Sequence, residues 1–138
     1  MKYLSIQDVE YVAFRLAQET MNWNEPIPDF GTRFQNKLEG CLDAPRQSFA
    51  NQQLYKGLIS KAAILFYLMI KNHPFQNGNK RIAMTTLMTF LHLNGKWIRV
   101  DTQELYNFTK WVAESNPKLK STTIDSINAF LKLYIINK

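Results

Sequence analysis

Apolar side chains recur at helical spacing along almost the whole chain, which predicts an all-α protein. The first helix is expected to open at Ser5, because Ser5 and Asp8 have the spacing of a capping box. Its apolar face consists of Ile6, Val9, Val12, Ala13 and Leu16. Two prolines and a glycine between residues 26 and 31 predict a loop after this helix.

Five further helices are expected, which gives a compact bundle of about six. Their predicted ranges are about 33–42, 54–71, 79–93, 102–115 and 122–136. The stretch 43–53 is expected to be irregular, and 97–100 a short extended link. No strand-rich region is expected.

Two of these helices are expected to be central. The apolar residues of 79–93 cover too much of its circumference for a surface helix, and 54–71 is similarly apolar. The later helix is predicted to begin near Asn79 or Lys80, with Gly95 as its C-terminal stop. His73 precedes a proline, which disfavours helical geometry and places it on the loop between the two helices.

That loop and the helix start after it concentrate polar chemistry, in the run His73-Pro-Phe-Gln-Asn-Gly-Asn-Lys-Arg81. Lys80 and Arg81 fall at a helix N-terminus, which already carries about half a positive charge. A phosphate bound by the N–H groups of Gly78 and Asn79 and by both cations resolves this conflict. In the plainer alternative each residue is an ordinary loop or surface residue. The combination, with a helix on each side, favours the anion site.

The same run predicts how the loop works. His73 lies at the mouth of the proposed phosphate site, where it is placed to accept a proton from an incoming hydroxyl as general base. The cations and N–H groups then stabilise charge on the transferred group. Pro74 and Phe75 are expected to anchor the loop, with the Phe75 ring packed inward.

The run resembles the signature of the Fic/Doc superfamily, His-Pro-Phe-x-acid-Gly-Asn-Gly-Arg. His73, Pro74, Phe75, Gly78, Asn79 and Arg81 match that pattern. Lys80 replaces the last glycine, as in the Doc (death-on-curing) branch. The Leu-Asn-Gly sequence at 93–95 is also similar to Doc-like proteins, so the resemblance extends over nearly the whole chain.

This resemblance implies a transferase that uses ATP as co-substrate. Fic enzymes transfer AMP from ATP to a protein hydroxyl. In the Doc branch, the lysine is associated with transfer of the γ-phosphate, which makes a protein kinase that targets elongation factor Tu and blocks translation. Phosphorylation by way of His73, Lys80 and Arg81 is therefore placed ahead of AMP transfer.

Asn77 departs from the wider pattern, which has an acidic Mg²⁺ ligand at this position. An amide oxygen can bind Mg²⁺ but supplies no charge, and Mg²⁺ usually relies on carboxylates and phosphate oxygens. The sequence therefore predicts weakened Mg²⁺ binding through Asn77. A non-catalytic binding or regulatory module that keeps the fold and its anion pocket stays open as the alternative to an enzyme.

Length and composition agree with one domain over residues 1–138. The single Cys41 excludes a disulfide framework, and no secretory signal or long apolar run is present, so a cytoplasmic chain without a membrane partner is expected. A net charge of +6 suits a nucleotide or an acidic protein partner. The cations are scattered, with 80–81 the only adjacent pair, which makes direct nucleic-acid binding the weaker interpretation.

Regulation is expected to come from a partner. Self-inhibiting Fic proteins carry a Ser/Thr-x-x-x-Glu-Gly/Asn helix, and the closest match here, Gln35-x-x-x-Glu39-Gly40, lacks the hydroxyl residue. Doc-like toxins are instead restrained by a small antitoxin whose disordered tail folds into a helix in a groove. The resemblance therefore implies an antitoxin that acts in trans.

Overall fold

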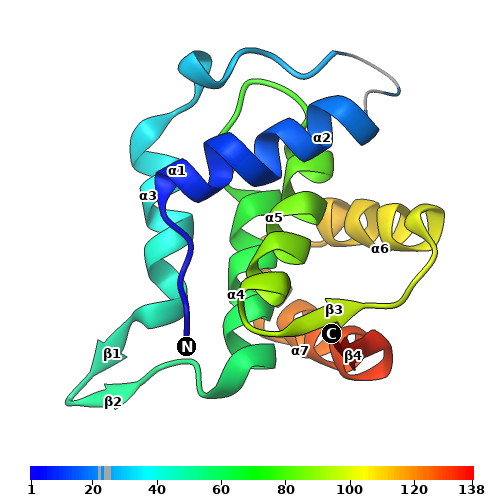
Figure 1. Cartoon of the computed structure of the whole chain (residues 1–138). Helices are drawn as coiled ribbons and strands as arrows, with labels where there is room; N and C mark the ends of the chain where they lie inside the picture. The colour runs from blue at the N-terminus through cyan, green and yellow to red at the C-terminus, as the bar shows by residue number, and fades with distance from the viewer. Residues whose placement is uncertain (22, 24–25) are drawn as a thin grey trace.

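The computed structural model describes residues 1–21, 23 and 26–138, and it is predominantly helical (Figure 1). The first helix runs without a break through α1 (Ile6–Asp8), a π-helical segment (Val9–Phe14) and α2 (Arg15–Thr20). It is followed by α3 (Gln35–Asp43), α4 (Gly57–Lys71), α5 (Asn79–Leu93), α6 (Thr102–Glu114) and α7 (Lys120–Tyr134). The predicted all-α bundle of about six helices is confirmed for the described part of the chain.

Short elements connect these helices. Three 3₁₀ turns lie at Phe30–Thr32, Ala44–Arg46 and Pro117–Leu119. Strands β1 (Ser48–Phe49) and β2 (Gln52–Gln53) form a small antiparallel hairpin, which projects from the lower left of the view in Figure 1. Strands β3 (Lys96–Ile98) and β4 (Ile135–Asn137) form a second antiparallel pair.

The predicted capping box is present at the start of the first helix. The Ser5 hydroxyl accepts a hydrogen bond from the Asp8 N–H at 3.1 Å, and the Ser5 N–H donates to the Asp8 carboxylate at 2.9 Å. Each bond satisfies a backbone or side-chain group at an end where intrahelical partners are missing. The π-helical turn that follows was not predicted. It lies where Val9, Ala13 and Phe14 are buried.

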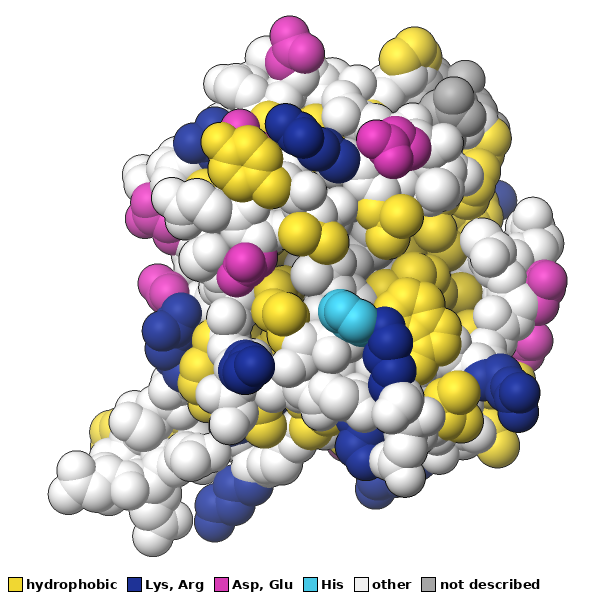
Figure 2. Space-filling view, viewed as in Figure 1, with side chains coloured by type: hydrophobic (Ala, Val, Ile, Leu, Met, Phe, Trp, Pro, Cys, Tyr) yellow, Lys and Arg dark blue, Asp and Glu magenta, His cyan; other side chains and the backbone are white. Residues whose placement is uncertain are grey.

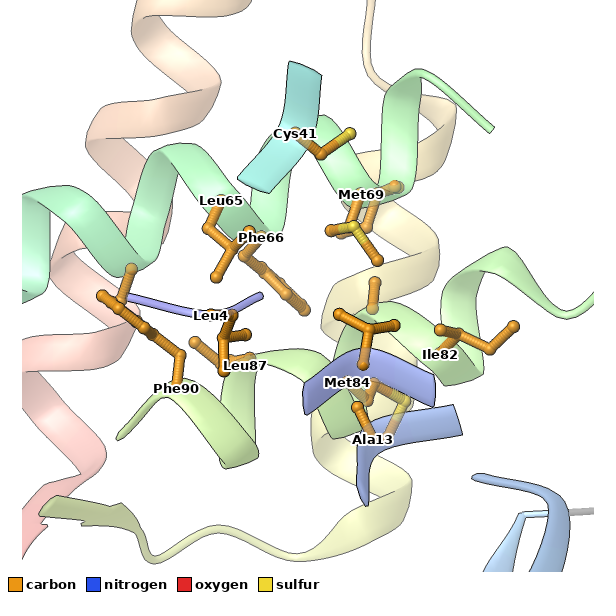
Figure 3. Packing of buried hydrophobic residues seen from close by; sticks show 14 of the residues in the cluster. Leu4, Ala13, Cys41, Leu65, Phe66, Met69, Ile82, Met84, Leu87 and Phe90 are labelled. Carbon is orange, nitrogen blue, oxygen red and sulfur yellow. The ribbon is translucent and has the colours of Figure 1, made fainter. Parts of the chain in front are cut away.

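Helices α4 and α5 pack against each other at the centre, as predicted. Helix α5 also contacts the first helix, α6 and β3, so it has neighbours on several sides. Figure 3 shows Leu65, Phe66 and Met69 of α4 facing the same core as Met84 and Leu87 of α5. Burial of side chains of this size contributes about 1.5–3 kcal/mol each, so this helix pair is the rigid base of the loop between them.

The C-terminal segment differs from the prediction. The last helix ends at Tyr134 rather than Ile136, and residues 135–137 form β4 instead. Ile135 and Ile136 lie opposite Ile98 and Trp97. β-Branched and aromatic side chains suit such cross-strand positions, and the pairing satisfies the backbone of the expected 97–100 link.

The irregular stretch 43–53 also contains structure that was not expected. Ala50 and Asn51 at the tip of the β1–β2 hairpin have φ angles of 52° and 64°. Two successive positive φ angles are the geometry of a tight type I′ hairpin turn. The turn was missed because alanine is not a residue that signals it.

Charged side chains are dispersed over the surface in Figure 2, where Lys and Arg lie among Asp, Glu and uncharged residues. No continuous basic stripe crosses this face. None of the helices described is long and apolar enough to cross a membrane.

Candidate functional site

The loop between α4 and α5 is attached to the N-terminal third of the chain. Phe75 is only 2% exposed, and its ring lies 5.5 Å from the Phe14 ring and 6.0 Å from the Phe30 ring, centroid to centroid. The Pro74 carbonyl accepts a hydrogen bond from the Phe34 N–H at 2.9 Å. Pro74 and Phe75 are therefore both buried and both contact residues outside the loop, and the Phe75 ring packs inward.

Asn79 closes the loop onto the start of α5. Its side-chain oxygen accepts from the Phe75 N–H at 2.9 Å, and its amide nitrogen donates to the Phe75 carbonyl at 2.8 Å. These two bonds fix which way the amide points. The sequence predicted only a contribution from the Asn79 backbone N–H, and it missed this clamp because the partner lies across a loop of unknown shape.

Gly78 is required by the local backbone. Its φ of 73° lies in the left-handed region, and a Cβ added there would lie 3.1 Å from Ile27 Cγ1 and 3.4 Å from Arg81 Nη2. Gly78 is the N-cap of α5 and makes no side-chain capping bond, and the first turn of the helix contains no acidic residue. This helix start therefore presents the positive end of its dipole together with two cations.

A cavity of about 360 Å³ lies over this helix start. It brings together every residue that the sequence predicted to act on a nucleotide. Its lining consists of Ile70, His73, Gln76, Asn77, Gly78, Asn79, Lys80, Arg81, Tyr106 and Ala113. Neither Tyr106 nor Ala113, both on α6, was predicted to belong to the site, since sequence alone does not tell which face of α6 approaches the loop.

His73 is exposed at the cavity and has a φ of 49°. Positive φ is uncommon for residues other than glycine, and such strain often accompanies functional sites. Its Nδ1 lies 3.4 Å from the Asn79 amide nitrogen, which is long for a hydrogen bond. The contact orients the ring loosely and connects it to the Phe75 clamp.

Arg81 is more buried than a solvated helix start implies. It is only 4% exposed, and its Nη1 donates to the carbonyls of Met21 at 3.0 Å and Trp23 at 2.8 Å. Part of the guanidinium therefore binds the backbone of Met21 and Trp23, while the residue also lines the cavity. This structural role was not predicted, because residues 21 and 23 are distant in sequence.

No group of three or more His, Cys, Asp or Glu side chains arranged to hold a metal occurs among the residues that the structure describes. Asn77 is partly buried and lines the cavity beside Lys80, which is also partly buried. A hard cation at Asn77 would therefore need phosphate oxygens to complete its coordination.

Comparison with known proteins assigns the chain to a family. A sequence profile of the Fic/DOC family matches residues 3–91, and the chain belongs to that family. The matched range contains the whole loop and most of α5. The chain is also similar to "Toxin Doc" of Mycolicibacterium smegmatis, with 36% identity over 76 residues. That match covers 52% of this chain and 58% of the relative. No solved structure matches the chain significantly.

Proposed function

We propose that this chain is a toxin-like protein kinase that transfers the γ-phosphoryl group of ATP to a hydroxyl of a protein. The observation that carries the proposal is the single cavity over the start of α5, where a loop histidine, a glycine N-cap and two cations meet. Membership of the Fic/DOC family and the similarity to a Doc toxin support it.

Each residue of the cavity has a separate role in the proposed phosphoryl transfer. The triphosphate lies on the N–H groups of Gly78 and Asn79, with Lys80 and the cavity side of Arg81 as counter-charges. His73 accepts the proton of the attacking hydroxyl. The hydroxyl oxygen forms a bond to the γ-phosphorus, the bond from that phosphorus to the β–γ bridging oxygen breaks, and ADP leaves. Catalysis then consists mainly of positioning and charge stabilisation.

Mg²⁺ is a proposed companion of the nucleotide. Asn77 would hold it together with phosphate oxygens, and the ion would neutralise charge on the triphosphate. The lack of a carboxylate at this position predicts weaker metal binding than in relatives that carry an acid there.

The proposed acceptor is a component of translation. By family resemblance it is elongation factor Tu, whose phosphorylation would block protein synthesis. The exposed position of His73 supports a macromolecular acceptor, because the hydroxyl of a protein must reach the His73 imidazole from solution.

Two other functions make different predictions for the same cavity. A Fic-type AMP transferase would attack the α-phosphorus instead, and Lys80 is the residue that argues against it, since it occupies the place of the glycine that lets phosphates approach the backbone. A non-catalytic module would bind anions without transferring any group. This alternative rests on Asn77, which stands where the family pattern has an acidic Mg²⁺ ligand.

Parallel incubations with γ-labelled and α-labelled ATP distinguish these functions. The purified chain is mixed with cell lysate and with purified elongation factor Tu, and labelled protein is separated by electrophoresis. We expect label on protein from γ-labelled ATP only. Label from α-labelled ATP alone would establish AMP transfer, and no labelling from either nucleotide would favour the binding module.

We also propose a small antitoxin that acts in trans by laying a helix in an apolar groove. A cavity of about 190 Å³ lies between the first helix, α5 and β3. Val12, Leu16, Met88 and Trp97 contribute its apolar lining. A helix binds such a surface through apolar anchors three or four residues apart.

The groove can be tested without disturbing the catalytic loop. Val12 is 47% exposed and lines the groove, whereas Tyr11 is 56% exposed and is absent from the lining. Val12→Asp should therefore prevent neutralisation by a co-expressed antitoxin, and Tyr11→Asp should not. Equal neutralisation of both variants would argue against this groove.

A further inference from the structure

A second hollow lies at the opposite end of α4 from the loop that carries His73. It has a volume of about 520 Å³ and is lined by the first turn of α4, by α7 and by the β3–β4 pair. Figure 1 shows the start of α4 in the lower part of the view, whereas the loop leaves α4 at the top. A helix of 15 residues spans roughly 22 Å, so this hollow is separate from the cavity over α5.

Three lysines from different elements line this hollow. Lys56 precedes α4, Lys96 is on β3 and Lys132 is on α7. No aspartate or glutamate occurs among the described residues of the lining. Lys56 and Lys132 are exposed, and the ammonium of neither makes a hydrogen bond or ion pair with another residue that the structure describes. Two of the three positive charges are therefore open to a partner from solution.

The surface between these cations is apolar. Leu58 and Ile59 of α4 and Ile135 of β4 line the hollow, and all three are only partly buried. An apolar side chain of a ligand can therefore cover them while its neighbours reach the lysines. A buried apolar anchor inside a polar rim is the usual anatomy of a protein interface.

We propose that this hollow docks an acidic segment of a partner protein. One apolar side chain of the segment packs on Leu58, Ile59 and Ile135, and carboxylates lie beside the lysines. Such charge complementarity speeds encounter and fixes the register of the bound segment. Because the hollow is remote from the cavity over α5, the segment and a nucleotide can be bound at the same time.

The shape of the surface favours a protein over a nucleic acid. The lysines surround a hollow with an apolar floor, whereas a phosphate backbone is followed by cations along a groove. None of the described lining residues is aromatic, so the hollow offers no ring on which a base would stack. The net charge of +6 also suits an acidic protein partner.

Fluorescence anisotropy with the full chain and a labelled synthetic peptide tests this surface. The probe has a central leucine between two runs of glutamate. A second peptide replaces the leucine by glutamine, and a labelled single-stranded oligothymidylate serves as the nucleic-acid probe. Binding of the leucine peptide that is tighter than binding of the other two probes is the expected result.

The double variant Lys56→Glu/Lys132→Glu reverses two charges that hold no other described group. Lys96 is left unchanged, because its ammonium donates to the Asn137 side chain. Lys110→Glu/Lys118→Glu is the matched control, since both of these lysines are exposed and neither lines the hollow. The two variants have the same net charge, and thermal unfolding checks that each one folds.

We expect the Lys56/Lys132 variant to bind the acidic peptide at least about fourfold more weakly. Each reversal exchanges an exposed ion pair for a like-charge pair, which corresponds to about 2- to 30-fold in affinity. The control variant should stay within about twofold of the wild type, because salt screens distant charges. ATP affinity should not change in either variant, since none of these lysines lines the cavity over α5.

Three results would overturn the proposal. The first is that the wild type does not bind the acidic peptide, and the second is that both variants lose the same affinity for it. The third is tighter binding of the oligothymidylate with a selective loss in the Lys56/Lys132 variant, which would assign the surface to nucleic acid. The phosphoryl transfer proposed for the cavity over α5 is unaffected by any of these results.

Discussion

Asn79→Ala should destabilise the chain strongly, because it removes both hydrogen bonds that hold the backbone of Phe75. The Asn79 side chain accepts from the Phe75 N–H at 2.9 Å and donates to the Phe75 carbonyl at 2.8 Å. Phe75 is only 2% exposed, so these two backbone groups have little access to water once the amide is gone. Each unsatisfied buried polar group costs about 1–3 kcal/mol. The expected loss for the two groups is therefore about 2–6 kcal/mol.

Urea unfolding monitored by circular dichroism measures this loss. With a slope of about 2 kcal/mol per molar urea, the midpoint should fall by roughly 1–3 M while the slope stays constant. His73 should also lose its 3.4 Å neighbour, so label transfer should fall in the same variant even under conditions where it is folded.

Asn94→Ala is the matched control. Asn94 uses the same chemistry at the other end of α5, where its side chain accepts from the Lys2 N–H at 2.8 Å and donates to the Lys2 carbonyl at 2.9 Å. These two bonds are exposed, so water replaces them, and the partly buried bond from the Asn94 amide to the Phe90 carbonyl at 2.9 Å is the main loss; the expected cost is about 1–2 kcal/mol, below that of Asn79→Ala. If Asn79→Ala costs no more than Asn94→Ala, burial of the loop backbone is not what holds the site together.

Substitutions at three further residues, Arg81, Lys80 and Cys41, have separate expected effects on stability or transfer. Arg81→Lys keeps the charge but loses the planar guanidinium that reaches the carbonyls of Met21 and Trp23. It should lower both the unfolding midpoint and the affinity for ATP, by about 1.5–3 kcal/mol for each charged hydrogen bond that is lost. An unchanged midpoint in denaturation and an unchanged ATP affinity in calorimetry would contradict this. Lys80→Gly should abolish transfer from γ-labelled ATP, because the lysine charge is lost and the phosphates can approach the backbone more closely. Adding Asn77→Asp to this variant should favour transfer from α-labelled ATP, which gel autoradiography would show. Undiminished γ transfer by Lys80→Gly would mean that Lys80 has no part in the mechanism. Burial raises the pKa of the Cys41 thiol from 9.0 to about 12, so the thiol keeps its proton to a higher pH in the native protein than in the unfolded chain. The stability that this difference contributes is fully present below pH 9.0 and is lost as the pH rises toward 12. The urea midpoint of the wild type should accordingly fall more steeply above pH 9.0 than that of Cys41→Ala, and parallel pH profiles would refute this.

Local pattern was enough to predict the order of the helices and the position of the loop, but not the π-helical turn or the end of the last helix. The helix α5 begins at Asn79 and ends at Leu93, as expected from the turn before it and from Gly95, whose φ is 76°. Helix periodicity, a proline after His73 and a glycine stop are all short-range signals. They place a feature along the chain without knowledge of its neighbours.

Long-range contacts could not be predicted in the same way. The pairing of β3 with β4 joins residues about forty positions apart, and a helix was expected where β4 lies. The hydrogen bonds from Arg81 to Met21 and Trp23 and the approach of Tyr106 to the cavity are of the same kind. Each depends on how helices pack, and no local pattern specifies the partner.

Transfer from γ-labelled ATP by His73→Ala, compared with the wild type, shows whether His73 is the general base. His73 is exposed and its ring makes one long contact among the described residues, so its removal should leave the unfolding midpoint nearly unchanged. Triphosphate binding should also persist, because the anion site is formed by the start of α5. We expect transfer to protein to be abolished in this folded, ligand-binding variant. Full transfer by His73→Ala would contradict the assignment of this histidine as the base.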